Sequence, residues 1–307
     1  MSKEHEIDKV ILEDALSGLK AARRFAGEIL GFPSTIAVVD QGGFVIAAHS
    51  MDGGLPFTME IAIDKAWTAA ILGGPTQMLG RMTDPRQALM PLDQLPLGQH
   101  GWGLYTRYRG RICPIMGGLP IRDKNMKVIG AVGTSGCPSA EEDNRVSQAC
   151  WSAMYEEKPN YTPFEEGNRD EKGGEDLTFS CAMWLTKRAF EEAKKQSVNI
   201  SVAVARDSGL FLVIHRMDNT PMGTVEIARD KAWTAATFGI PTTEVSRYGA
   251  GKDAGTSINR SGDNERLTTI PGGLPLLKDG KVFGAIGISG GTPEQDLQIA
   301  RKIVKKF

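Results

Sequence analysis

The first half of the chain alternates between helical and strand-like patterns of apolar residues. Apolar residues recur at helical spacing over residues 7–30, with charged residues between them, which predicts an amphipathic opening helix. Two β-rich runs follow, at residues 36–39 and 44–48, and an Asp/Gly turn separates them. Two such runs around such a turn indicate a β-hairpin.

The same order of helix and hairpin then repeats. A helix with an alanine stripe is predicted over residues 58–72, and β-rich runs at residues 115–121 and 128–132 predict a second hairpin. Ser139 and Glu142 have the spacing of a capping box, which predicts the start of a closing helix. Because hairpins form antiparallel pairs, we expect an α+β fold with helices packed on an antiparallel sheet of at least four strands.

The second half of the chain repeats the first. Residues 58–77 and 224–243 are identical at 14 of 20 positions. A second matched block contains G-G-L-P, which begins at Gly117 and again at Gly272, followed in each half by a G-A-x-G-x-S-G segment. The chain is therefore two diverged copies of one domain joined head to tail.

The limits of the two copies follow from composition. A stretch rich in acidic residues, glycine and proline separates the halves and is typical of a linker. We place the first copy at residues 1–157, the linker at 158–175 and the second copy at 176–307.

Charge and cysteine usage narrow the class of protein. The formal net charge of -1 gives little attraction for nucleic acid or for an anionic membrane. No apolar run approaches the roughly 18–20 residues that span a bilayer, and the polar N-terminus is unlike a signal peptide. The four cysteines have neither disulfide nor C-x-x-C metal spacing. We therefore expect a cytoplasmic protein with free thiols whose partners are neither nucleic acid nor membrane.

Several motifs together resemble the GlcG/HbpS-like family, which includes the C-terminal domain of PduO-type adenosyltransferases. They are the Asp/Gly hairpin turn, a Met-Asp pair before an A-x-x-K-A-x-T-A helix, the G-G-x-P strand and the G-A-x-G-x-S-G segment. The resemblance covers both copies except the linker and two variable loops. It implies a profilin-like fold, assembly into oligomers, haem binding, and a setting in small-molecule catabolism or stress response. We accordingly expect the copies to pack as a pseudo-dimer with ligand pockets at their seam, and the chain to form a homo-oligomer.

Two kinds of titratable residue recur at matched positions in the copies. His49 and His215 each end a strand and are candidate ligands of haem iron; alternatively, each only caps a strand edge through a ring hydrogen bond. Lys65 and Lys231 lie beside the alanine stripe. They can hold a haem propionate or a substrate carboxylate, or they can simply pair with Asp or Glu.

Other candidate ligand-binding residues differ between the copies. Arg216 precedes the Met-Asp pair, as arginine often does in the family, whereas Ser50 takes this place in the first copy. The variable loop of the first copy contains His100, Tyr105 and Arg107. Aromatic residues mixed with arginines suit a planar, anionic ligand, and they suit a subunit interface equally well.

These observations predict a protein that binds a small molecule, with haem as the leading candidate cofactor. The alternative is a haem-independent lyase, isomerase or hydrolase that acts on a small aromatic or carboxylated substrate, and the asymmetry between the copies favours it. A third alternative is a structural or regulatory protein without a ligand. No catalytic triad or metal-protease motif is readable, so no catalytic residue is assigned.

Overall fold

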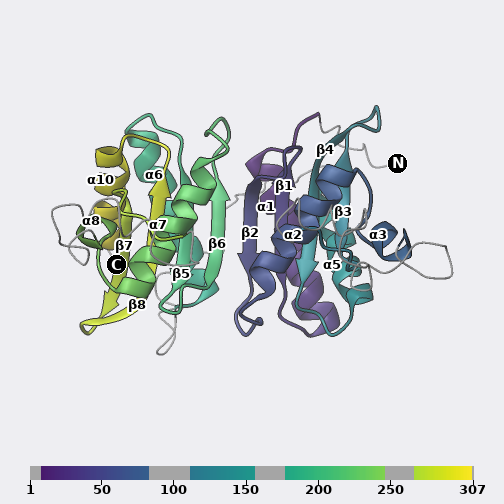
Figure 1. The fold of residues 1–307 in the computed structure, drawn as a ribbon, viewed down its shortest axis with the longest axis horizontal. Helices are drawn as coiled ribbons and strands as arrows, with labels where there is room; N and C mark the ends of the chain where they lie inside the picture. The colour runs from purple at the N-terminus through teal and green to yellow at the C-terminus, as the bar shows by residue number, and fades with distance from the viewer. Residues whose placement is uncertain (1–7, 83–110, 156–176, 246–265, 306–307) are drawn as a thin grey trace, which may run out of the picture. The chain divides into compact units, whose positions relative to one another are not determined.

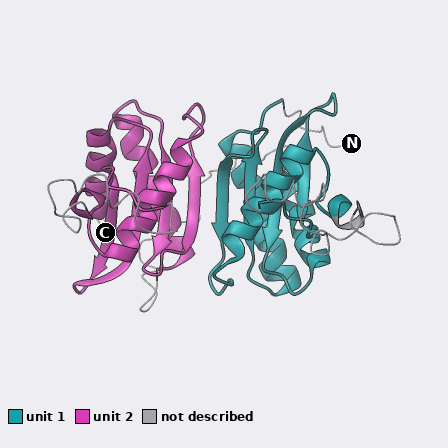
Figure 2. Cartoon of the chain, viewed as in Figure 1, with its two compact units in different colours: residues 1–161 teal, residues 162–307 magenta. Residues whose placement is uncertain are grey.

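The computed structural model describes residues 8–82, 111–155, 177–245 and 266–305. The chain divides into two compact units, Met1–Tyr161 and Thr162–Phe307 (Figure 2). The predicted linker at residues 158–175 lies outside the described residues, so the domain limits stay a prediction.

The first unit has the predicted order of helix, hairpin, helix, hairpin and helix (Figure 1). Its elements are α1 (Leu12–Arg24), η1 (Phe25–Leu30), β1 (Thr35–Asp40), β2 (Val45–Ser50), α2 (Thr58–Leu72), α3 (Gln77–Met82), β3 (Gly118–Arg122), β4 (Val128–Ser135) and α5 (Ala140–Tyr155). The opening helix differs from the prediction in two ways. It begins at Leu12, where the Asp14 carboxylate accepts a hydrogen bond from the Ile11 N–H, and its last part, η1, is π-helical.

The second unit repeats this order. Its elements are α6 (Phe179–Lys195), β5 (Ser201–Arg206), β6 (Phe211–Arg216), α7 (Thr224–Phe238), α8 (Thr242–Val245), β7 (Gly273–Lys278), β8 (Lys281–Ser289) and α10 (Pro293–Val304). The predicted capping box is confirmed, since Ser139 and Glu142 exchange hydrogen bonds before α5, and Thr292 and Gln295 make the same exchange at the start of α10.

Each unit contains an antiparallel sheet with the same strand order. The order is β3-β4-β1-β2 in the first unit and β7-β8-β5-β6 in the second. A bulge in the first hairpin also recurs, between Val38 and Val39 and between Val204 and Ala205. The two copies therefore share their fold down to local irregularities, and the predicted α+β class with antiparallel sheets is confirmed.

Helices cover both faces of each sheet (Figure 1). In β4, a Cβ added to Gly133 would lie 2.2 Å from the carbonyl oxygen of Ala62 in α2, whereas the next residue, Thr134, contacts Ser147 of α5 at 2.7 Å. Because successive strand residues point to opposite faces, α2 covers one face and α5 the other. Among the described residues, no helix is long and apolar enough to cross a membrane.

Candidate functional site

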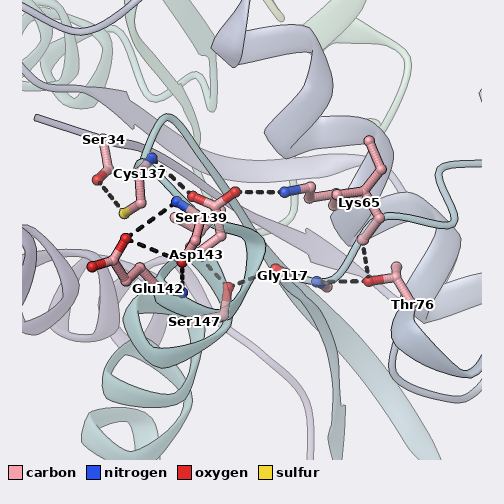
Figure 3. A network of polar contacts seen from close by, with 12 residues as sticks. Ser34, Lys65, Thr76, Gly117, Cys137, Ser139, Glu142, Asp143 and Ser147 are labelled. Carbon is pink, nitrogen blue, oxygen red and sulfur yellow. Dashed lines mark hydrogen bonds and ion pairs between the residues drawn. The ribbon is translucent and has the colours of Figure 1, made fainter. Parts of the chain in front are cut away.

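A buried Lys–Asp ion pair lies at the same place in each unit. In the first unit, Lys65 Nζ in α2 donates to Asp143 Oδ2 in α5 at 2.7 Å (Figure 3). In the second, Lys231 Nζ in α7 donates to Asp296 Oδ2 in α10 at 2.8 Å. All four side chains are less than one-tenth exposed. Each pair therefore ties the helix on one face of the sheet to the closing helix on the other.

Backbone groups hold both members of the second pair. Lys231 also donates to the carbonyl oxygen of Ile288 at 2.7 Å, and the Gly291 N–H donates to the other carboxylate oxygen of Asp296 at 3.0 Å. Burial lowers the pKa of Lys231 and raises the pKa of Asp296, and in both groups the opposite charge of the partner counteracts this shift. Each charge is thus stable in the interior only while its partner is present.

The first glycine of each Gly-Gly motif makes room for the ion pair. Gly117 and Gly272 have φ angles of 119° and 121°, which side-chain-bearing residues rarely adopt. A Cβ at Gly117 would lie 3.0 Å from the Nζ of Lys65, and one at Gly272 would lie 3.0 Å from the Nζ of Lys231. The Gly-Gly motif of the family resemblance therefore accommodates the buried lysine.

A threonine that follows the central helix of each unit (α2 or α7) is hydrogen-bonded to the Gly-Gly motif. The Thr76 hydroxyl donates to the Ile115 carbonyl oxygen at 2.7 Å and accepts a hydrogen bond from the Gly118 N–H at 3.0 Å. Thr242 makes the matching contacts with Ile270 and Gly273 in the second unit. The backbone at the start of β3 and of β7 is thus fixed by the same pair of threonine hydrogen bonds in both copies.

The structure places the predicted lysines in these pairs. Sequence analysis left open whether Lys65 and Lys231 bind a ligand carboxylate or pair with an acidic residue, and the described contacts are those of the second alternative. Binding of a ligand by either lysine would require its ammonium to leave a buried carboxylate, and it stays a prediction. The partners Asp143 and Asp296 could have been recognised as a pair, because they too recur in both copies.

The predicted histidines lie in the interior. His49 and His215 are 1% and 0% exposed. The ring of His215 lies 6.2 Å from the ring of Phe190 in α6, and thus on the sheet face opposite α7. The structure therefore does not bring histidine and lysine of one copy together on the same face.

The last predicted residue among those described, Arg216, ends β6 and is partly exposed. It pairs with Ser201 across the β5–β6 ladder, and the Ser201 hydroxyl contacts the Thr224 hydroxyl at the start of α7 at 2.8 Å. The corresponding site in the first copy holds Ser50, which accepts a hydrogen bond from Thr35 at 3.0 Å. His100, Tyr105 and Arg107 lie outside the described residues.

A charged cluster on α7 distinguishes the second copy further. Arg229 forms an ion pair with Glu226 at 2.6 Å, and its guanidinium lies 5.3 Å from the centre of the Phe211 ring. Arg266 lies 5.4 Å from the same ring. Burial, with a smaller effect of the Glu226 charge, raises the pKa of Asp230 to about 6. The equivalent of Arg229 in the first copy is Ile63, so this cluster is not duplicated.

The thiols are poorly suited to nucleophilic chemistry. All four cysteines are free, and burial raises the pKa of Cys113 and that of Cys137, the latter to about 11. Both thiols are therefore protonated at neutral pH. No group of three potential metal ligands occurs within the described residues.

Comparison with known proteins finds the following relatives, each of which matches less than half of this chain. The corrinoid adenosyltransferase PduO of Salmonella typhimurium is 33% identical over 130 residues, which cover 42% of this chain but only 38% of PduO. Protein GlcG of Escherichia coli is 36% identical over 99 residues, which cover 32% of this chain and 70% of GlcG. The crystal structure of a PduOC–haem complex is similar at 32% identity and a TM-score of 0.39, with 43% of this chain and 95% of that chain covered.

A family model described as "Haem degrading protein HbpS-like" matches this chain twice. The matches span residues 10–152 and 177–305 and so include nearly all of the described part of both copies. This protein is therefore a tandem member of the HbpS-like family.

Proposed function

We propose that this protein binds haem or a closely related planar small molecule that carries carboxylates. The observation that supports the proposal most is that both copies, at residues 10–152 and 177–305, match a family described by a haem-degrading member. A haem ligand needs a cationic or hydrogen-bonding partner for its propionates and, in most haem proteins, a side chain that ligates iron.

The described residues meet these two needs unequally. Arg216 offers a partly exposed guanidinium at the end of β6, which suits a propionate because its fork of donors matches a carboxylate. His49 and His215 do not present an open imidazole, since both rings are buried. Iron ligation by either ring requires it to become exposed and stays a prediction, as do ligand contacts by His100, Tyr105 and Arg107.

Titration of the purified apoprotein with haemin, followed by absorbance, tests the proposal. We expect a saturable Soret shift of fixed stoichiometry. His49→Ala and His215→Ala, measured alongside, report iron ligation if one of them changes the position of the Soret band. Their urea unfolding must be measured as well, because removal of a buried ring leaves a cavity.

The opposing result is a haemin response no larger than that of a non-specific control protein. That result would contradict haem binding, and a screen of small aromatic and carboxylic acids as ligands and substrates would then be the next measurement. Packing of the copies as a pseudo-dimer and assembly into a homo-oligomer remain part of the proposal, and light scattering of the apoprotein tests the assembly.

A further inference from the structure

One arginine is anchored alike in the two copies, yet its side chain lies in different positions. In the first copy, the Thr68 hydroxyl donates to the Arg111 carbonyl oxygen at 3.3 Å. In the second copy, the Thr234 hydroxyl donates to the Arg266 carbonyl oxygen at 3.1 Å. Each threonine hydroxyl also accepts a hydrogen bond from the backbone N–H two residues after the arginine, at 3.0 and 3.1 Å. Both arginine side chains therefore start from the same place beside the central helix.

In the first copy, this arginine is paired with a carboxylate of α2. Arg111 Nε donates to Asp64 Oδ1 at 3.0 Å, and the guanidinium lies 4.7 Å from the centre of the Trp67 ring. The indole is packed against the first hairpin, because a Cβ added to Gly43 would lie 2.3 Å from its Cδ1 atom. Both side chains of the ion pair are partly exposed, so the pair forms at the surface and needs no cavity.

In the second copy, the equivalent arginine lies over a different ring. The Arg266 guanidinium is 5.4 Å from the centre of the Phe211 ring, and that of Arg229 is 5.3 Å from the same centre. A cation over an aromatic ring is a favourable contact. Val45 occupies the place of this ring in the first copy, at the matching position of the hairpin ladder. The second copy therefore gives its arginine a position that the first copy lacks.

The carboxylate that corresponds to Asp64 is Asp230. Among the described residues, no group donates a hydrogen bond to it or forms an ion pair with it. The charged groups that act on it there are Glu226 and Arg229 in α7 and Arg266 before β7, and the strands packed against α7 add none. Burial, with a smaller effect of Glu226, raises the pKa of Asp230 to about 6, and the two arginines counteract this shift. The carboxylate thus changes its charge near neutral pH, within reach of Arg266.

The charge of Asp230 decides between the two positions of Arg266. A cation over a ring and a partly exposed ion pair are both weak contacts. Arg266 has further contacts in its present position, so a move exchanges contacts for others. Protonation of Asp230 removes the attraction of the ion pair but leaves the contact with the ring unchanged. Arg229 does not compete for the carboxylate, since it is held in an ion pair with Glu226 at 2.6 Å.

We infer that Arg266 is a pH-dependent switch on the surface of the second copy. It lies over the Phe211 ring when Asp230 is protonated, and it pairs with the Asp230 carboxylate when that group is ionised. In the paired position its guanidinium lies over Trp233, as the arginine of the first copy lies over its tryptophan. A rise in pH therefore moves a cation along α7 and uncovers part of the Phe211 ring. Neither position involves a haem ligand, so the switch is independent of the proposed function.

The indole of Trp233 reports the position of Arg266. It is packed like that of Trp67, since a Cβ added to Gly209 would lie 2.8 Å from its Cδ1 atom. The full chain is labelled with nitrogen-15 tryptophan, and its indole N–H signals are followed by NMR from about pH 4.5 to 7.5, on either side of the Asp230 pKa. Trp233→Phe assigns the signal, and urea unfolding of each variant confirms that it is folded.

We expect the Trp233 signal of the parent to shift in a single step with a midpoint at or just below pH 6, because the ion pair favours the ionised carboxylate. The shift should be absent from Asp230→Asn, which has nearly the same shape, and also from Arg266→Gln. A direct effect of the carboxylate charge on the indole would persist without the arginine. The Trp67 signal is the matched control and should stay constant, since Val45 offers its arginine no second position.

A third variant removes the competing position. Phe211→Val introduces the residue of the first copy and should move the midpoint of the Trp233 signal to lower pH. The inference would be overturned by a Trp233 signal that does not titrate in the parent, by a shift that survives in Arg266→Gln, or by an equal shift in Asp230→Asn. The two polar variants decide the question even if Phe211→Val does not fold.

Discussion

The lysine, aspartate and glycine that meet in each copy show how strongly one residue can depend on another. Lys65 and Asp143 are 78 positions apart in sequence, and Gly117, which lies against both, belongs to neither helix. Local pattern places each of them correctly on its element. It does not show that the lysine points inward to a carboxylate, because that depends on three segments that meet only in the folded chain.

Alanine at the first glycine of the second Gly-Gly motif should destabilise the protein strongly. Gly272→Ala forces a side chain into a φ of 121° and places its Cβ 2.6 Å from the Ile288 carbonyl oxygen. We expect a loss of ~2–5 kcal/mol in the free energy of unfolding, measured in urea. Gly223→Ala is the control, since no atom lies within 4 Å of its added Cβ, and it should change stability by less than ~0.5 kcal/mol. Equal effects of the two substitutions would contradict this account.

Asp230 should make stability depend on pH. Its native pKa of about 6 lies above the ordinary Asp value of about 3.9, so the folded state binds the proton more tightly than the unfolded state. The stability that Asp230 contributes is therefore present below about pH 4 and lost as the pH rises through about 6.

Urea unfolding across this pH window, with the parent and Asp230→Asn, measures the effect. The variant should show a flatter pH dependence and be more stable than the parent at neutral pH. Glu226→Gln should lower the native pKa of Asp230 and flatten the profile in part, because a neighbouring negative charge is removed. A slope that is the same in the parent and in Asp230→Asn would disprove this assignment.

At the scale of elements, the sequence predicts how closely the central helix of each copy approaches its sheet. The alanine stripe of α2 lies against Gly133, and a Cβ there would be 2.5 Å from the Ala66 nitrogen. Gly287 has the same relation to Ala232 in α7. Small residues on both surfaces are a local signal, so this packing was predictable. The burial of His49 was not predictable. Its strand, β2, is buried on both faces, so its sequence does not alternate between apolar and polar residues and does not show which way each side chain points.

The ion pair that joins α7 to α10 gives a prediction at this scale. Lys231→Met leaves the Asp296 carboxylate buried without its cation, and we expect a loss of ~3–5 kcal/mol in unfolding free energy. The double substitution Lys231→Met with Asp296→Leu should recover a large part of that loss, because no unpaired charge remains. A double-mutant cycle in urea checks this. Additive losses would mean that the pair is not coupled.

At the scale of the whole molecule, the duplication combines a shared framework with different surfaces. Both copies keep the ion pair, the anchoring threonines and the hairpin bulge, whereas Arg216, Thr220 and Arg229 occur only in the second. The repeat and the fold were readable from sequence, since 14 of 20 positions match in one segment. The burial of Thr220 was not, because the surroundings of a side chain can be recognised only after its neighbours are placed.

This asymmetry predicts a stoichiometry. Because Arg216 occurs only in the second copy, we expect the chain to bind one haemin at high affinity and Arg216→Ser to weaken that binding without revealing a second tight site. Haemin titration at protein concentrations well above the dissociation constant gives the number directly. Two equivalent sites per chain would show that the copies bind alike.

The positive-φ glycine beside each buried lysine also limits the order in which substitutions can accumulate. A side chain at Gly117 would lie against the Lys65 ammonium, and loss of Lys65 would leave the Asp143 carboxylate buried without its cation. A single substitution of Gly117 or Lys65 therefore lowers the stability of the fold. The two copies differ in sequence in their turns and variable loops, yet both retain this glycine, lysine and aspartate.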